Sequence, residues 1–153
     1  MSIYATVLTI HSWVRWFALV AGVGTTLAAV TGRVRGDNSP ADRWGLFAIM
    51  ALDIQMLLGL LLYLAVSPNM RPILADFGGA MKDPTLRFWA VEHTATMVAA
   101  IALAHLGRVL ARKAATPVAK RTRLMVCFGL ATVLMILGMP WPGRPGGREL
   151  FRL

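Results

Sequence analysis

Residues 3–30 read IYATVLTIHSWVRWFALVAGVGTTLAAV and contain a single charged side chain, that of Arg15. A helix needs roughly 20 mostly apolar residues to cross the hydrocarbon of a bilayer. This stretch is long enough, and it lacks the strict alternation of apolar and polar residues that a half-buried strand has. It also lacks the basic start and short apolar run of a cleavable signal peptide. The stretch therefore predicts a membrane-spanning helix that stays in the protein.

Three further apolar runs follow, at about residues 44–66, 86–107 and 124–141. The last run is short, and Trp141 extends it, because Trp is favoured at the membrane–water interface. Hydrophobic residues make up 57% of the chain, whereas soluble domains contain about 45–50%. We therefore predict an all-α membrane protein, a four-helix transmembrane bundle that forms one domain over residues 1–153.

The linkers contain residues that start or stop helices. Residues 36–40 (GDNSP) form a predicted turn. Asp42 and Thr85 are predicted to cap the second and third helices, because their side-chain oxygens can accept from free backbone N–H groups. Ser67-Pro68 is predicted to end the second helix, and Pro140 the fourth.

The chain is strongly basic, with a formal charge of +9. In a soluble protein this charge would suggest nucleic-acid binding, but here the basic residues lie mostly in the linkers and at the C-terminus. In membrane proteins, the loops that carry more Lys and Arg face the cytoplasm. The linkers after the first and third runs contain nine Lys and Arg residues: Arg33, Arg35, Arg43, Arg108, Arg112, Lys113, Lys120, Arg121 and Arg123. The opposite side has six: Arg71, Lys82, Arg87, Arg144, Arg148 and Arg152. We therefore expect both termini on the outer, periplasmic side and no nucleic-acid partner.

Cys127 is the only cysteine. A disulfide within the chain is excluded, and so are iron–sulfur clusters and zinc sites that need several thiolates from one chain. Cys127 lies in the fourth apolar run and is expected to pack there as a small buried side chain.

Ionisable and amide side chains inside the spans are costly, so each is a candidate functional residue. The candidates are His11, Arg15, Asp53, Gln55, Glu92 and His93. Counting from the outer ends of the spans places His11 about 12 Å and His93 about 10 Å deep. The same count places Arg15, Asp53 and Gln55 about 16–20 Å deep. The sequence thus predicts a histidine layer that includes Glu92, and a deeper polar layer.

Two imidazoles that face each other across a bundle can ligate a haem b iron, since each supplies one nitrogen lone pair. Arg15 is one helical turn from His11 and can bind a haem propionate. Its charge requires an anionic partner, which can be Asp53, Glu92 or the carboxylate of a cofactor.

Other interpretations stay open at this point. The two histidines can hydrogen-bond to Glu92, Asp53 or Gln55 and simply join the helices. The same polar cluster can transfer protons or ions, and methionine with histidine can bind Cu(I). His105 lies about 18 Å further along the third helix than His93, and we expect it to be an interfacial residue rather than a ligand.

Three segments carry a family resemblance: residues 11–16 (HSWVRW), 55–63 (QMLLGLLLY) and 81–93 (MKDPTLRFWAVEH). They resemble a family of small four-span bacterial membrane proteins commonly labelled cytochrome b. The resemblance extends over all four spans, and the segment ending in Glu92-His93 is its most specific part.

The resemblance implies a multi-pass protein of the bacterial inner membrane that binds haem b. The matching positions are His11, Arg15, Gln55, Arg87, Glu92 and His93. Among them, His11 and His93 are the expected iron ligands, and Arg15 or Arg87 is expected near the propionates. The expected function is that of a b-type-cytochrome-like electron-transfer subunit, rather than a complete enzyme. Its expected partners are the lipid bilayer, quinone, and other subunits of a respiratory or photosynthetic membrane complex. The alternatives are a non-redox accessory subunit and a small proton or metal-ion transport protein.

Overall fold

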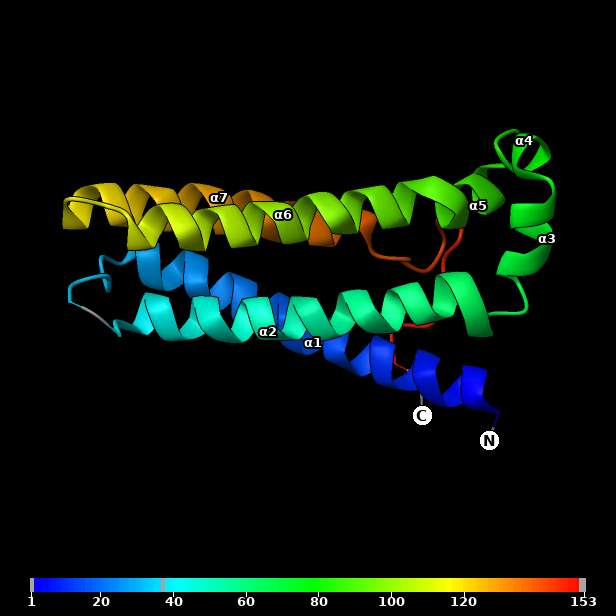
Figure 1. Ribbon diagram of the computed structural model, residues 1–153, viewed down its shortest axis with the longest axis horizontal. Coiled ribbons are helices and arrows are strands. Elements are labelled where there is room, and N and C mark those ends of the chain that lie inside the picture. The colour runs from blue at the N-terminus through cyan, green and yellow to red at the C-terminus, as the bar shows by residue number, and fades with distance from the viewer. Residues whose placement is uncertain (1, 37, 152–153) are drawn as a thin grey trace.

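The computed structural model describes residues 2–36 and 38–151. Four long helical segments run along the bundle (Figure 1). The first is α1 (Ile3–Val30), and the second is α2 (Pro40–Leu61), which continues through the π-helical turn η1 (Leu62–Val66). The third consists of α5 (Pro84–Arg87), η2 (Phe88–Glu92) and α6 (His93–Arg112), and the fourth is α7 (Pro117–Gly138). Two short helices, α3 (Met70–Ala75) and α4 (Phe77–Ala80), lie between the second and third segments.

All four segments are long and apolar enough to cross a membrane, over Ile3–Val30, Pro40–Val66, Pro84–Arg112 and Pro117–Gly138. The predicted all-α four-helix transmembrane bundle is confirmed. Both termini lie at one end of the bundle, together with α3 and α4 (Figure 1). We call this the terminal end, and we call the opposite end, with residues 31–36, 38–39 and 113–116, the loop end.

The first span has the predicted limits, but the fourth does not. The fourth span begins at Pro117 rather than near residue 124. The basic residues before residue 124 were not expected to belong to the span, but they form the first turns of the helix. There Arg121 Nε donates to the carbonyl of Ala29 and Arg123 Nη1 to that of Leu110, which ties α7 to two neighbouring helices. Trp141 lies beyond the helix and folds back to donate its indole N–H to the carbonyl of Ile136.

Side-chain caps explain where the second and third spans begin. Ser39 caps α2, and Asp42 is the third residue of a reciprocal capping box rather than the cap itself. Asp83, not Thr85, caps α5 and accepts from the backbone N–H of Leu86. Ser67 follows the second span as predicted. In the predicted turn, Asp37 lies outside the described residues, as does Arg152 of the charge count.

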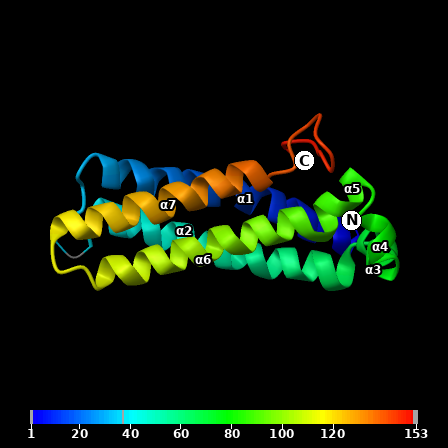
Figure 2. The same cartoon turned by 90° about the horizontal axis from the view of Figure 1, so that it is seen from above.

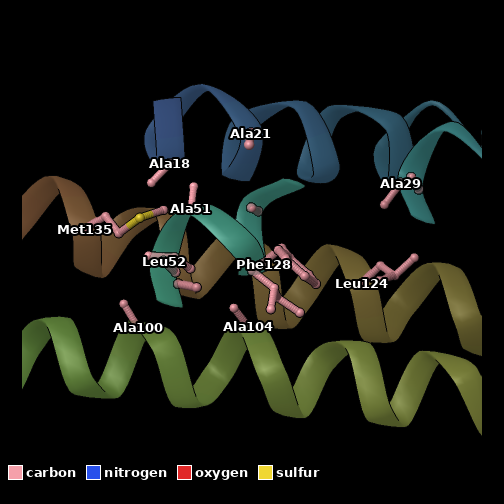
Figure 3. Close-up of a cluster of buried hydrophobic side chains, with 14 of the residues drawn as sticks. Ala18, Ala21, Ala29, Ala51, Leu52, Ala100, Ala104, Leu124, Phe128 and Met135 are labelled. Carbon is pink, nitrogen blue, oxygen red and sulfur yellow. The ribbon is translucent and has the colours of Figure 1, made fainter. Parts of the chain in front are cut away.

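The core of the bundle is built largely from alanine. Ala18, Ala21, Ala29, Ala100 and Ala104 are almost completely buried (Figure 3). Small side chains let helix backbones approach closely, which is how helices pack in a membrane, where there is no hydrophobic effect to join them. The largest fully buried side chains are Phe128, Leu124 and Thr25.

The C-terminal segment, residues 139–151, leaves α7 and crosses to α1 (Figures 1 and 2). Its turns use Gly143 and Gly146, which have positive φ angles of 82° and 71°. At its far end, the carbonyl of Leu150 accepts from Arg15 Nη2 at 2.6 Å. Phe151 stacks on Trp16 with ring centroids 5.3 Å apart. The segment is thereby attached to the middle of the α1 span.

Asp42 connects the start of α2 to the start of α7 at the loop end, and its replacement gives a first prediction. Its carboxylate lies 2.6 Å from Lys120 Nζ, and both side chains are largely buried. We expect Asp42→Ala to lower the free energy of unfolding by about 2 kcal/mol, because it removes the capping box and leaves a buried lysine unpaired. Reversible unfolding in SDS measures this loss. Asp83→Ala is the control, because it removes a simple cap and is expected to lower the free energy of unfolding by about 1 kcal/mol. Equal losses in both variants would contradict the account.

Candidate functional site

A cavity of about 580 Å³ opens between the helices. This volume is within the range of roughly 300–1,000 Å³ usual for small-molecule sites. All four long segments and the C-terminal segment contribute to its walls. Of the predicted site residues, His11, Arg15, Gln55 and His93 line it.

The two histidines face each other in this cavity, as predicted from their depths. Their ring centroids are 6.4 Å apart and their planes are inclined by 65°. His11 is on α1 and His93 begins α6, so the pair connects two separate spans. Both side chains are partly buried.

His93 is oriented by the end of α7. Its Nδ1 lies 2.7 Å from the carbonyl oxygen of Gly138, the last residue of that helix. A helix leaves its last carbonyls without intrahelical partners, so this oxygen accepts and Nδ1 carries the hydrogen. Nε2 then has the lone pair, and it makes no hydrogen bond to any residue that the structure describes. A carbonyl that fixes the tautomer in this way is the usual second partner of a metal-bound histidine.

His11 is held by packing rather than by its ring nitrogens. Its Nδ1 is buried without a hydrogen-bond partner, and Gln55 Nε2 donates instead to the His11 backbone carbonyl at 3.0 Å. Gly59 lies against the ring, and a Cβ there would be 3.4 Å from His11 Cε1, at van der Waals contact. Buried polar atoms are rarely unpaired, so this imidazole is available for a ligand.

Two guanidinium groups also line the cavity, those of Arg15 and Arg148. The Arg15 Nε atom is buried and unpaired, and the same guanidinium donates through Nη2 to the Leu150 carbonyl. Arg148 lies over the ring of Trp89, with Cζ 4.3 Å from the ring centroid. Among residues 2–36 and 38–151, no carboxylate is within ion-pair distance of either arginine. Two cations without an acidic partner favour an anionic ligand.

The remaining predicted residues lie elsewhere. Glu92 does not join the histidine layer, since it pairs with Arg87 at 2.6 Å and both side chains are nearly half exposed. Neither residue lines the cavity. Asp53 does not meet Arg15 or Gln55 in a deeper layer, because its carboxylate lies 2.8 Å from His105 Nε2. The partner expected for Arg15 from within the chain is therefore neither Asp53 nor Glu92.

Arg148 is the residue that sequence reasoning missed. It was counted only as a charge that sets orientation, because it lies after the last apolar run and belongs to no periodic pattern. Its position depends on the turns at Gly143 and Gly146, which bring the C-terminal segment back to the bundle. The glycine pair in PGRPGG (residues 142–147) was the only signal that a tight turn follows the fourth span.

Within the described part of the chain, no three His, Cys, Asp or Glu side chains gather as ligands for a metal ion. The polar side chains that line the cavity include two imidazoles, two guanidinium groups, the carboxylate of Glu149 and the amides of Gln55 and Asn69. Comparisons with models of protein families, with curated proteins and with solved structures found no match to this chain.

Proposed function

We propose that this protein is a b-type-cytochrome-like electron-transfer subunit of a membrane complex, in which His11 and His93 hold one haem b. The observation that carries the proposal is the spacing of the two rings. A metal–imidazole bond is roughly 2 Å long and the ligating nitrogen lies about 1 Å from the ring centre, so two imidazoles on one iron have centroids about 6 Å apart. The observed separation is 6.4 Å.

The donor chemistry fits the same group. Haem of the b-cytochrome type would take two ligands from the protein, and it carries two propionates, which are carboxylates. His11 Nδ1 is buried without a hydrogen-bond partner, and His93 Nε2 makes no hydrogen bond to a described residue. Arg15 and Arg148 supply two positive charges in the same cavity. This arrangement supports a flat dianionic ligand between the histidines, with one arginine for each carboxylate.

When bound, haem supplies a one-electron couple between ferrous and ferric iron. The chain's own residues bind and orient it. Gly138 fixes the tautomer of His93, and the rings of Phe88 and Trp89 pack against His93 at centroid distances of 5.8 and 5.5 Å. The apolar walls exclude water, as in other ligand pockets. Electrons would be exchanged with quinone or with neighbouring subunits of a respiratory or photosynthetic complex in the bacterial inner membrane.

A second candidate is a non-redox accessory subunit in which the same residues join the helices. The hydrogen bonds from His93 to Gly138 and from Gln55 to the His11 carbonyl both cross between spans and favour it. Such bonds stabilise a membrane bundle by about 0.6 kcal/mol on average. They leave the unpaired nitrogen atoms of His11 and Arg15 unexplained, and for this reason we prefer the haem-binding function.

The test is a haemin titration of the purified protein in detergent, followed by optical spectroscopy. The proposal predicts saturation at one haem per chain, with sharp b-type bands after reduction by dithionite. If the folded protein binds no haemin, or binds it without these bands, the haem-binding function is wrong and the accessory-subunit function replaces it.

The arginines give a sharper prediction. We expect Arg15→Gln and Arg148→Gln each to weaken haemin binding about tenfold, because each removes one charge-assisted contact to a propionate, worth about 1.4 kcal/mol. Arg87→Gln is the matched control, since Arg87 pairs with Glu92 outside the cavity. Binding constants from the same titration measure all three. An effect confined to Arg87→Gln would contradict the assignment of the propionate site.

A further inference from the structure

The carbonyl oxygen of Leu150 accepts hydrogen bonds from two consecutive side chains of α1. Arg15 Nη2 donates at 2.6 Å and Trp16 Nε1 donates at 3.1 Å. A carbonyl oxygen has two lone pairs, so it can accept both bonds. Phe151 adds a ring contact at the same place, because it stacks on Trp16 with an interplanar angle of 16°. Two hydrogen bonds and a ring stack therefore attach residues 150 and 151 to one turn of α1.

The depth of this attachment makes both partners depend on it. Arg15 lies about 18 Å along α1 from its first residue, Ile3. At such a depth, non-helical backbone is tolerated only where it is buried in protein or lines a cavity, because its polar groups need partners. The Leu150 carbonyl belongs to a non-helical segment and obtains its donors from Arg15 and Trp16. In return, Leu150 is the only described residue that accepts a hydrogen bond from Arg15.

The acceptor leaves the charge of Arg15 intact. A carboxylate in this position would largely cancel the positive charge, whereas a neutral carbonyl holds the guanidinium and leaves its charge for a ligand. Glu149 precedes Leu150 and lines the cavity, but its carboxylate is not within ion-pair distance of Arg15. The guanidinium also keeps a free donor, since Nε is buried without a hydrogen-bond partner. Arg15 is thus held in place while it remains charged and only partly hydrogen-bonded.

We propose that Leu150 and Phe151 are positioning residues, which hold Arg15 in the conformation that binds a carboxylate of the ligand. An unrestrained arginine side chain has many rotamers, and ordering it during binding lowers the affinity. The Leu150 carbonyl orders Arg15 before the ligand binds, and the stack of Phe151 on Trp16 keeps that carbonyl in place. The inference rests on the proposed function, in which Arg15 contacts a propionate, and it adds the residues that fix this contact.

The test compares haemin with haemin dimethyl ester, which has the same ring and iron but no carboxylates. Phe151→Ala removes the ring stack, and Phe151 does not itself line the cavity. We expect this variant to bind haemin about fivefold more weakly and the dimethyl ester as well as the wild-type protein does. Phe151→Tyr keeps an aromatic ring and should restore haemin binding. Phe151→Ala added to Arg15→Gln should cause no further loss, because both changes act on one contact.

Phe47 provides the matched control. Its ring also contacts a tryptophan, Trp44, and its side chain is 46% exposed, compared with 57% for Phe151. Neither Phe47 nor Trp44 lines the cavity, so Phe47→Ala should leave haemin binding unchanged. If Arg15→Gln weakens haemin binding and Phe151→Ala does not, the inference is overturned and the haem function stands. Equal weakening of haemin and ester binding in Phe151→Ala would also overturn it, because the loss would not involve the carboxylates.

A second readout needs no haemin. Phenylglyoxal modifies arginine side chains, and mass spectrometry measures its rate at Arg15 in the ligand-free protein in nanodiscs, with Arg87 as the internal reference. We expect Arg15 to react about threefold faster in Phe151→Ala than in the wild-type protein or Phe151→Tyr, because the side chain is no longer held in one rotamer. If the wild-type protein binds no haemin, the haem function is wrong and this rate decides the inference. Equal rates at Arg15 in the three proteins would overturn it.

Discussion

Replacing His93 with alanine is expected to abolish the b-type bands of the reduced protein and to weaken haemin binding at least 100-fold. The reason is that loss of His93 would remove a bond to the iron, whereas loss of a group that only orients a ligand already costs about 10–100-fold in metal affinity. His11→Ala is expected to have the same effect, because the two rings lie 6.4 Å apart in one cavity. Haemin titration and reduced-minus-oxidised spectra measure both variants.

Two controls separate ligation from folding. His105→Ala changes a histidine of the same helix that pairs with Asp53 and does not line the cavity, so its bands are expected to be retained. Added imidazole should restore a six-coordinate spectrum in His93→Ala, since the vacated ligand position is open to a small molecule. If His105→Ala loses the bands while His93→Ala keeps them, the ligand assignment is wrong.

The second large effect concerns the packing of α6 on α7. A Cβ at Gly107 would overlap the Cβ of Cys127, which is next to the backbone and cannot rotate away. We expect Gly107→Ala to lower the free energy of unfolding by about 2 kcal/mol, because overpacking forces the two helices apart. Reversible unfolding in SDS, followed by circular dichroism, measures this loss.

Gly129 provides the matched control. It is also within a long helix, but a Cβ there would meet its nearest neighbour, Thr26 Cγ2, at 3.7 Å, an ordinary contact. Gly129→Ala is therefore expected to be neutral or to stabilise the protein by up to about 1 kcal/mol, because alanine favours helix over glycine. A Gly107→Ala variant as stable as Gly129→Ala would show that the two helices do not need this close approach.

The four spans could be predicted from the sequence because a membrane demands long apolar runs, and such runs are visible without any tertiary information. Their ends were less predictable. The basic start of α7 does not look like a span, yet Arg121 and Arg123 make it helical by donating to carbonyls of α1 and α6. These contacts exist only after the helices have packed.

The candidate site, too, could be predicted from the sequence only in part. The common depth of His11 and His93 follows from the fixed rise of an α-helix, and the two rings do meet. Which way Asp53 and Glu92 face depends on the rotation of each helix about its axis, which depth alone does not fix. Asp53 faces His105, and Glu92 faces Arg87. The role of Arg148 depends on a non-helical return of the chain, for which the sequence has no periodic signal.

The most direct test of the central claim is the electron paramagnetic resonance spectrum of the oxidised, haemin-loaded protein. The account predicts a low-spin ferric signal from one haem per chain, because His11 and His93 would both ligate the one iron. A high-spin signal, or a low-spin signal that persists in His11→Ala and His93→Ala, would contradict it.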